Sequence, residues 1–414
     1  MSSEKKKMKM TMMNFNNDNI NKDLKNNFLK YLGQTSDSPY LLEIEKADGI
    51  YLYSPKGEKY IDLISGVSVS SLGHNSPIIK EAILKQVTKH LHLMVYGEFI
   101  QEAQVNLAEY LVHLLPEKLN NVYFINSGSE AIEAAIKLAK KFTHKQKIFA
   151  LNNAYHGSTA GALSLCGNDD FKSSCMPLLS NVNFIDINNY DDIEKIDNDT
   201  ACVVMEPIQA EGGIRIAEKN WVQKLHNKCK ENAALLIFDE IQTGFGRCGK
   251  MFCFEHFDIV PDIVCFAKAL GGGMPLGALA APQSIMASFK NNPVLGHITT
   301  FGGHPVSCAA SLATLKYIND NNIVDSVEEK SFLFKKLLVH PKIKEIRGFG
   351  LLLAVELNNS TEIQRLIKIG LETGFVTDWF IFHDTAFRIA PPLTITKDEI
   401  KIACDLILKA LNKL

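Results

Sequence analysis

This chain of 414 residues has few arginines, few tryptophans and a net charge close to zero. It has two tryptophans and five arginines, although lysine and arginine together number 44. The formal net charge of -2 gives no overall attraction to nucleic acid or to an anionic membrane. The scarcity of arginine matters most, because a planar guanidinium is the side chain best suited to clamp a carboxylate. The five are Arg215, Arg247, Arg347, Arg365 and Arg388.

The chain also lacks long apolar runs and a paired cysteine framework. No stretch approaches the roughly 18 apolar residues that a membrane-spanning helix needs. The nine cysteines are scattered, and Cys248 and Cys253 fit no common zinc spacing. We therefore expect reduced thiols, no metal site and a cytoplasmic protein. The basic run at residues 5–7 is followed by no apolar stretch, which argues against an export signal.

The length, with 46% apolar residues, is sufficient for two packed domains. Residues 1–27 are a lysine, asparagine and methionine mixture, which predicts a disordered tail. An alternating pattern around a Pro-Gly turn predicts a hairpin at 50–63, within an N-terminal segment at 28–71 that packs with the small domain. From residue 122, short apolar runs alternate with helical patterns, which predicts an α/β fold with a mostly parallel sheet. We place the large domain at 72–310 and the smaller C-terminal domain at 311–414.

Two polar residues stand at the ends of predicted buried strands. Lys268 follows the apolar run 263–267, and Asp239 follows the run 235–238. Ligands of parallel sheets bind beyond the carboxyl ends of the strands. A lysine can hold an aldehyde as a Schiff base, and a carboxylate can keep a pyridine nitrogen protonated, as a pyridoxal phosphate enzyme requires. Gln242 shares a face with Asp239 if the chain turns helically there, so one could reach a ring nitrogen and the other a ring oxygen.

Two loops that follow strands offer further contacts for such a cofactor. Ser127, Gly128 and Ser129 join a strand to a helix, where free N–H groups favour an anion. The competing interpretation is an ordinary helix cap formed by Ser129. Tyr155 follows the next strand, where its ring could stack on a cofactor or pack within the loop.

Three other segments are weaker signals when taken alone. Residues 205–213 contain acids that could be solvated loop charges, and residues 297–303 form a glycine-rich loop with two hydroxyls. Residues 244–249 fit the glycine spacing of dinucleotide-binding loops. However, they begin five residues after the strand and precede no helical pattern, so we reject a nucleotide site there.

Taken together, these segments resemble the class III, or ω-amino, aminotransferases. Within that family they are most similar to the acetylornithine and ornithine aminotransferase branch. The resemblance runs from about residue 49 to residue 414. It rests on residues 60–66, 72–74, 126–130, 155–157, 206–209, 239–247, 268, 271–275, 300–303 and 388–393. It implies the pyridoxal phosphate-dependent transferase fold type I, with a mostly parallel seven-stranded sheet in the large domain beside a smaller α+β domain. It also implies a place in amino-acid metabolism, such as arginine biosynthesis.

The resemblance implies a role for each candidate residue. The residues that would bind pyridoxal 5'-phosphate are Ser127, Gly128, Ser129, Tyr155, Asp239, Gln242, Lys268 and Thr300. Lys268 would also be catalytic, and Thr300 would reach the cofactor of the neighbouring subunit, so that the working unit is a homodimer with shared active sites. Arg388 would clamp a substrate carboxylate, Glu211 would pair with it as a gate acid, and Thr299 would complete the substrate site.

The implied reaction is a ping-pong transfer of an amino group from N-acetylornithine or ornithine to 2-oxoglutarate. Ser158 stands where many members of that branch have an arginine that binds a second carboxylate, and Ala210 stands where a glycine usually precedes the gate acid. Ser158 favours a second interpretation, a transaminase for another ω-amine such as 4-aminobutyrate, a diamine or a diaminononanoate-type substrate. An aminomutase, which needs no external oxo acid, and a non-enzymatic scaffold are further alternatives.

Overall fold

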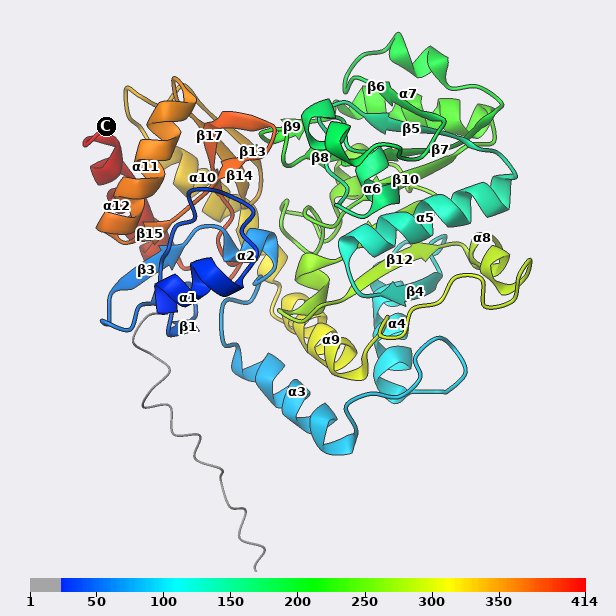
Figure 1. The fold of residues 1–414 in the computed structure, drawn as a ribbon, viewed down its shortest axis with the longest axis horizontal. Coiled ribbons are helices and arrows are strands. Elements are labelled where there is room, and N and C mark those ends of the chain that lie inside the picture. The colour runs from blue at the N-terminus through cyan, green and yellow to red at the C-terminus, as the bar shows by residue number, and fades with distance from the viewer. Residues whose placement is uncertain (1–23) are drawn as a thin grey trace, which may run out of the picture.

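The computed structural model describes residues 24–414 (Figure 1). The predicted tail therefore lies outside the described residues, except for its last four positions. Those four begin helix α1 (Leu24–Tyr31), so the prediction of disorder was wrong for residues 24–27. None of the helices over 24–414 has the length and apolar character that a membrane crossing needs.

A seven-stranded sheet forms the centre of the large domain, as the family resemblance implied. Every strand runs parallel to the others except β12, which is antiparallel to both of its neighbours. In spatial order the strands are β4 (Asn121–Ile125), β12 (Gly277–Ala281), β11 (Ile263–Phe266), β10 (Leu235–Asp239), β7 (Thr200–Met205), β5 (Lys147–Leu151) and β6 (Val182–Ile185).

Helices cover both faces of this sheet, and alternate strand residues point to opposite faces. Ile237 of β10 packs in the same core as α5 (Gly128–Thr143), whereas Phe238 packs with α7 (Lys219–Glu231) on the other side. The remaining helices of this domain are α3 (Pro77–Lys89), α4 (Glu102–Leu114), α6 (Ala160–Ser164), α8 (Gln283–Met286) and α9 (Pro305–Asp320). A short ribbon of β8 (Ile208–Gln209) and β9 (Arg215–Ile216) follows β7.

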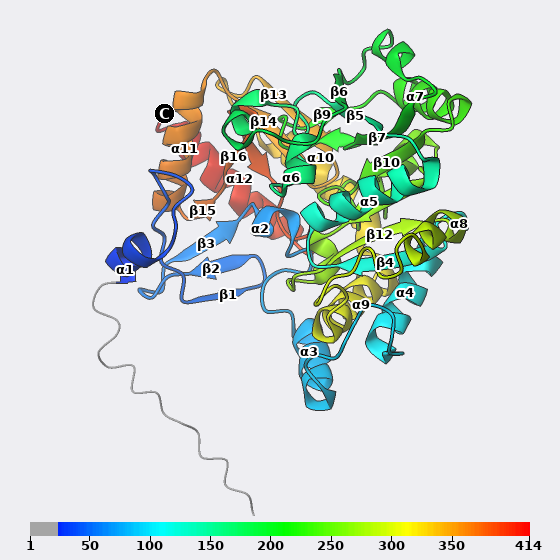
Figure 2. The ribbon, with the colours of Figure 1, turned by 45° about the vertical axis from the view of Figure 1, so that its right-hand side comes forward.

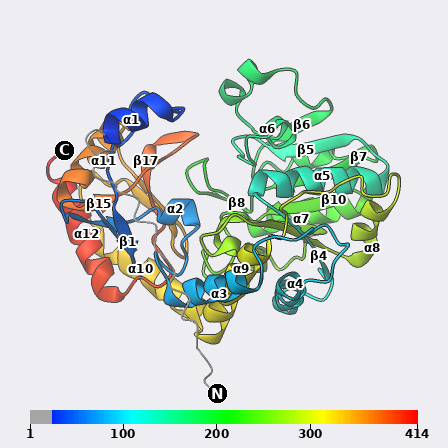
Figure 3. The same ribbon diagram turned by 60° about the horizontal axis from the view of Figure 1, so that its bottom comes forward.

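The C-terminal domain is an antiparallel sheet covered by helices. Its strands, in spatial order, are β13 (Glu345–Phe349), β14 (Leu352–Glu356), β17 (His383–Ile389) and β16 (Trp379–Phe380). Its helices are α10 (Val327–Leu337), α11 (Ser360–Thr373) and α12 (Lys397–Leu411). Figure 3 shows this domain on one side of α9 and the seven-stranded sheet on the other.

The N-terminal segment contributes a second small sheet beside this domain (Figure 2). Strands β2 (Tyr51–Tyr53) and β3 (Lys59–Asp62) pair antiparallel, as the alternating pattern at 50–63 predicted, and β1 (Lys46–Asp48) adds to β2 in antiparallel orientation. Strand β15 (Phe375–Val376) then adds to β3 in parallel, and Ile61 shares an apolar core with Phe375. The segment therefore packs against the C-terminal domain although it lies far from it in sequence, while the boundaries that we gave the domains stay predictions.

The rejected glycine-rich segment 244–249 folds into turns. It has a structural role at the boundary between the domains. The buried Arg247 donates from Nη1 to the carbonyl oxygens of Leu351 at 2.9 Å and Pro391 at 2.6 Å. These two bonds join this segment to the C-terminal domain, while Nε and Nη2 of Arg247 are buried without a hydrogen-bond partner within residues 24–414.

Candidate active site

A cavity of about 410 Å³ lies at the carboxyl end of the seven-stranded sheet. Strands β10 and β11 are parallel neighbours, and Asp239 is in register with Cys265, so Asp239 and Lys268 emerge at the same edge. Of the eight residues predicted to bind the cofactor, all but Thr300 line this cavity. Lys268 has φ of 48°, a left-handed conformation that is uncommon outside glycine and often marks a functional position.

Lys268 is held by an amide and is partly buried. Its Nζ donates to Oε1 of Gln242 at 2.7 Å. Burial lowers the pKa of the Lys268 ammonium, and Glu211 opposes that effect only in part. Because Oε1 of Gln242 faces the lysine, its Nε2 points the other way, where this buried donor has no partner within residues 24–414. The lysine is thus disposed toward the neutral form that a base or nucleophile needs.

Asp239 is fixed by a buried histidine that the sequence did not reveal. Nδ1 of His156 lies 2.7 Å from Oδ2 of Asp239, and the backbone N–H of Ile241 donates to Oδ1 at 3.0 Å. Although burial opposes charging of the ring, the Asp239 carboxylate raises the pKa of His156. His156 follows Tyr155 directly in the sequence, but only the fold shows that it reaches Asp239. These two contacts fix the orientation of the Asp239 carboxylate.

A second buried carboxylate, Glu206, supports two loops of the site. Its Oε1 accepts the backbone N–H of Tyr155 at 2.9 Å, and its Oε2 accepts the backbone N–H of Ala210 at 3.1 Å. Burial raises the pKa of Glu206 to about 7. Sequence reasoning treated this acid as a possible solvated loop charge, and that interpretation was wrong because Glu206 is 5% exposed.

The start of α5 closes one end of the cavity. The helix cap is Ser127, whose hydroxyl accepts the backbone N–H of Glu130 at 3.3 Å, so the alternative of a cap formed by Ser129 was wrong. Ser129 instead accepts the backbone N–H of Ser158 at 3.3 Å. A Cβ at Gly157 would lie 2.0 Å from the Ser129 hydroxyl, so only glycine allows these two loops to approach so closely.

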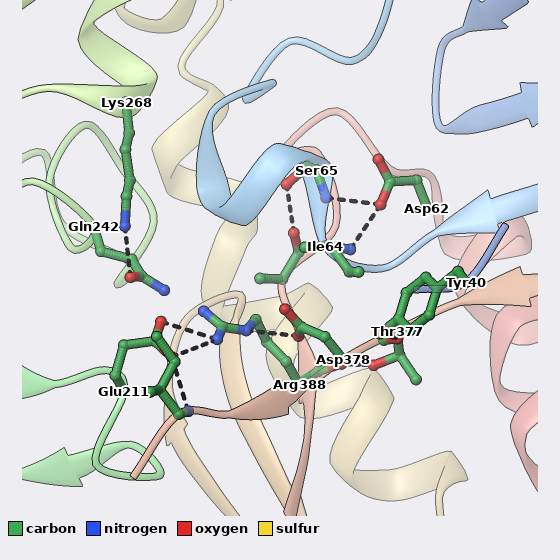
Figure 4. A network of polar contacts seen from close by, with 12 residues as sticks. Tyr40, Asp62, Ile64, Ser65, Glu211, Gln242, Lys268, Thr377, Asp378 and Arg388 are labelled. Atoms are coloured by element: carbon green, nitrogen blue, oxygen red, sulfur yellow. Dashed lines mark hydrogen bonds and ion pairs between the residues drawn. The ribbon is translucent and has the colours of Figure 1, made fainter. Parts of the chain in front are cut away.

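Arg388 lies between two carboxylates, and Figure 4 shows its guanidinium on the side where Gln242 and Lys268 lie. Its Nη2 donates to both oxygens of Glu211 at 2.9 and 3.0 Å, and its Nε donates to Oδ1 of Asp378 at 2.9 Å. The two carboxylates raise the pKa of Arg388 against the effect of burial. Arg388 in turn lowers the pKa of Glu211, although burial opposes this. Sequence reasoning did not find Asp378, since no local pattern marks it.

Thr299 and Thr300 lie away from this group of residues. Neither lines the cavity around Lys268, and Thr300 is exposed on the surface. The Thr299 hydroxyl accepts the backbone N–H of Gly302 at 2.9 Å. Within one chain, therefore, these threonines do not join the other predicted site residues, and their predicted roles stay predictions.

The cavity fits pyridoxal phosphate in its donor set. The helix start at Ser127 offers free N–H groups to a phosphate, and Asp239 offers a charge to a pyridinium nitrogen. Lys268 offers an amine to an aldehyde, and the unpartnered Nε2 of Gln242 offers a hydrogen bond to a ring oxygen. Each group of the cofactor thus has a matching backbone or side-chain group at one cavity.

Comparison with known proteins agrees with this chemistry. The sequence profile described as aminotransferase class-III matches residues 32–411. The acetylornithine aminotransferase of Clostridium acetobutylicum is 40% identical over 86% of this chain and 92% of its own length. The structure of the ornithine aminotransferase of Toxoplasma gondii has a TM-score of 0.88 at 28% identity, covering 94% of each chain. The adenosylmethionine-8-amino-7-oxononanoate aminotransferase of Methanocaldococcus jannaschii has a TM-score of 0.86 at 28% identity, covering 94% of this chain and 98% of that one.

Proposed function

Because this chain belongs to the class III aminotransferases, which depend on pyridoxal phosphate, we propose that it moves an amino group from N-acetylornithine or ornithine to 2-oxoglutarate. The observation that carries the proposal is that Lys268 and Asp239 line one cavity, and that the guanidinium of Arg388 lies on the side of Gln242 and Lys268. Donor and acceptor would take turns there in a ping-pong mechanism. The similarity to an acetylornithine aminotransferase supports this donor and a place in arginine biosynthesis. A cytoplasmic location stays a prediction.

We assign the cofactor to the residues that line the cavity. Ser127, Gly128 and Ser129 would hold its phosphate, Asp239 its ring nitrogen and Tyr155 its ring face, with Gln242 at the phenolic oxygen and Lys268 at the aldehyde. When bound, pyridoxal phosphate withdraws electrons from the carbon that bears the amine. Nζ of Lys268, whose pKa burial lowers, then takes the proton from that carbon. His156 keeps Asp239 oriented throughout.

The substrate carboxylate would bind Arg388. While a donor reacts that has no carboxylate near its reacting amine, Glu211 remains paired with Nη2 of Arg388 and neutralises the guanidinium. A 2-oxo acid would displace the Glu211 side chain and use the freed guanidinium. Thr299 would line the same substrate site once a second subunit is present.

A screen of donors against 2-oxoglutarate, with glutamate release as the readout, tests this function. N-acetylornithine and ornithine should give the highest kcat/KM, and omission of the oxo acid should stop product formation after one turnover. Continued product formation without any oxo acid would indicate an aminomutase instead. Lys268→Ala serves as the matched control, since it should fold and bind both substrates without turnover.

Three neighbouring aromatic rings, called here the aromatic rim, favour a second candidate, a transaminase for another ω-amine. They belong to Tyr155, Phe382 and Phe171. The ring of Tyr155 lies 6.3 Å from that of Phe382, which in turn lies 5.0 Å from Phe171. Beside them, the hydroxyls of Tyr155 and Ser158 are 3.1 Å apart. Such a rim suits a donor whose far end is apolar or cationic better than one with a carboxylate. Under this candidate Ser158→Arg should raise kcat/KM for N-acetylornithine relative to 4-aminobutyrate or a diamine.

We further propose that the working unit is a homodimer. Two segments near Thr300 expose large apolar side chains, including Ile100 at 96% and Phe301 at 53%. The rings of His92 and Phe301 are 4.8 Å apart, so the two segments contact each other. Exposed apolar surface of this kind is typical of subunit interfaces.

Light scattering tests the dimer. Ile100→Lys and Phe301→Glu should convert the protein to a monomer, whereas Phe332→Glu, an exposed position on α10, should leave the dimer intact. A wild-type protein with the mass of a single chain would contradict the proposal.

A further inference from the structure

Arg388 is held from two sides by carboxylates of different origin. Asp378 immediately precedes β16, which pairs with the strand β17 that carries Arg388. Glu211 comes from the loop between β8 and β9, beyond the carboxyl end of the large sheet. One carboxylate is therefore part of the same sheet as the guanidinium, and the other reaches it from the large domain.

The backbone around Asp378 is locked to Arg388 by hydrogen bonds. The N–H of Arg388 donates to the carbonyl oxygen of Asp378 at 2.9 Å, and the hydroxyl of Thr377 donates to the carbonyl oxygen of Arg388 at 2.6 Å. The hydroxyl of Tyr40 donates to the carbonyl oxygen of Thr377 at 2.9 Å. These bonds hold the backbone of Asp378 beside Arg388, so its short side chain starts from a position fixed within the same sheet, whereas Glu211 reaches the guanidinium with a longer side chain from the other domain.

The guanidinium itself has one orientation under these constraints. Its Nε is occupied by Asp378, and its carbon lies 4.7 Å from the centre of the Phe380 ring, which packs against it. Nη1 is buried and has no hydrogen-bond partner within the described part of the chain, and the residue is 1% exposed. In Figure 4 this end of the side chain faces Gln242.

We infer that Asp378 is a positioning residue that holds Arg388 so that only its Nη1–Nη2 edge is offered to the carboxylate of the oxo acid. This inference rests on the proposed function, in which Arg388 receives that carboxylate. With Nε occupied, an incoming carboxylate takes the place of Glu211 on Nη2 and adds a bond to Nη1. Asp378 also keeps a negative partner on Arg388 while Glu211 is displaced, which limits the cost of a buried charge during the exchange.

Binding of glutarate, an unreactive dicarboxylate, tests this role by calorimetry on the holoenzyme. Asp378→Ala should raise the Kd about tenfold, because the guanidinium loses the charge-assisted bond that orients it. Asp378→Asn keeps an oxygen that can accept from Nε, so its Kd should stay within about twofold of the wild-type value or fall. Asp384→Ala, which removes an exposed carboxylate on β17, is the matched control and should bind as wild type.

Two results would overturn the inference. One is unchanged or tighter binding by Asp378→Ala, and the other is a loss in Asp378→Asn as large as that in Asp378→Ala. Thermal melts of all variants identify a general loss of folding, which Asp378→Asn should avoid. If the wild type binds glutarate but transaminates no donor, the proposed function fails while the role of Asp378 stands or falls on these Kd values.

Discussion

Replacement of Glu206 by glutamine should change the pH dependence of stability in a direction that the structure fixes. Burial raises the pKa of this carboxyl from 4.5 to about 7 in the folded protein. Wild type therefore holds a proton at this site between pH 4.5 and 7 that the unfolded chain releases, and its stability falls as pH rises through that window. The shift corresponds to about 3 kcal/mol at most. The glutamine in Glu206→Gln cannot ionise, so this variant does not lose stability in this way as the pH rises.

Equilibrium unfolding in urea from pH 5 to 8 measures the effect. At pH 5 the variant should be less stable by about 1 kcal/mol, because its amide N–H₂ faces the N–H of Tyr155 or Ala210 and one hydrogen bond is lost. By pH 8 the variant should have gained up to about 3 kcal/mol relative to wild type. Glu109→Gln, an exposed position on α4, should follow wild type throughout. A constant difference between wild type and Glu206→Gln across this range would refute the reasoning.

Three further predictions concern the site. Lys268→Ala should abolish turnover with an unchanged far-UV circular dichroism spectrum, and residual turnover above about 0.1% of wild type would contradict its role in proton transfer. Arg388→Ala should raise the KM for 2-oxoglutarate by about a hundredfold and that for a diamine far less, and equal effects would exclude the carboxylate clamp. Thr300→Val should weaken cofactor retention, measured by dialysis and absorbance, only while the protein is dimeric, so an equal loss in the Ile100→Lys monomer would argue against a contact across the interface.

Much of the fold could be predicted because the strands of the large sheet are continuous apolar runs. Strand β10, for example, is buried along its whole length and reads clearly in the sequence. Strand β12 was missed, since its glycine, alanine and leucine residues have little intrinsic strand preference. It is a strand because β11 and β4 pair with it on either side, which is a tertiary effect.

In the candidate site, too, residues beside recognisable strands could be predicted, whereas those that depend on tertiary contacts could not. Asp239 and Lys268 could be predicted because each directly follows a recognisable strand. His156, Glu206 and Asp378 could not, because their partners lie 83, 51 and 10 residues away in the chain. Glu206 illustrates the difficulty, since an acid in a loop is usually solvated and only the fold around it shows that it is buried.

The contacts of Glu211 indicate how its side chain would leave Arg388. The backbone N–H of Phe382 donates to the carbonyl oxygen of Glu211 at 3.0 Å, a contact between a large-domain loop and the C-terminal domain that does not involve the carboxylate. The N–H of Ile381 donates to Oε2 at 3.2 Å and would lose this partner. Because the backbone contact can persist, displacement of Glu211 requires a rotation of one side chain and no separation of the domains. The proposed carboxylate exchange at Arg388 would therefore be a local event, and its cost would be the loss of the ion pair with Glu211 and of the hydrogen bond from the N–H of Ile381.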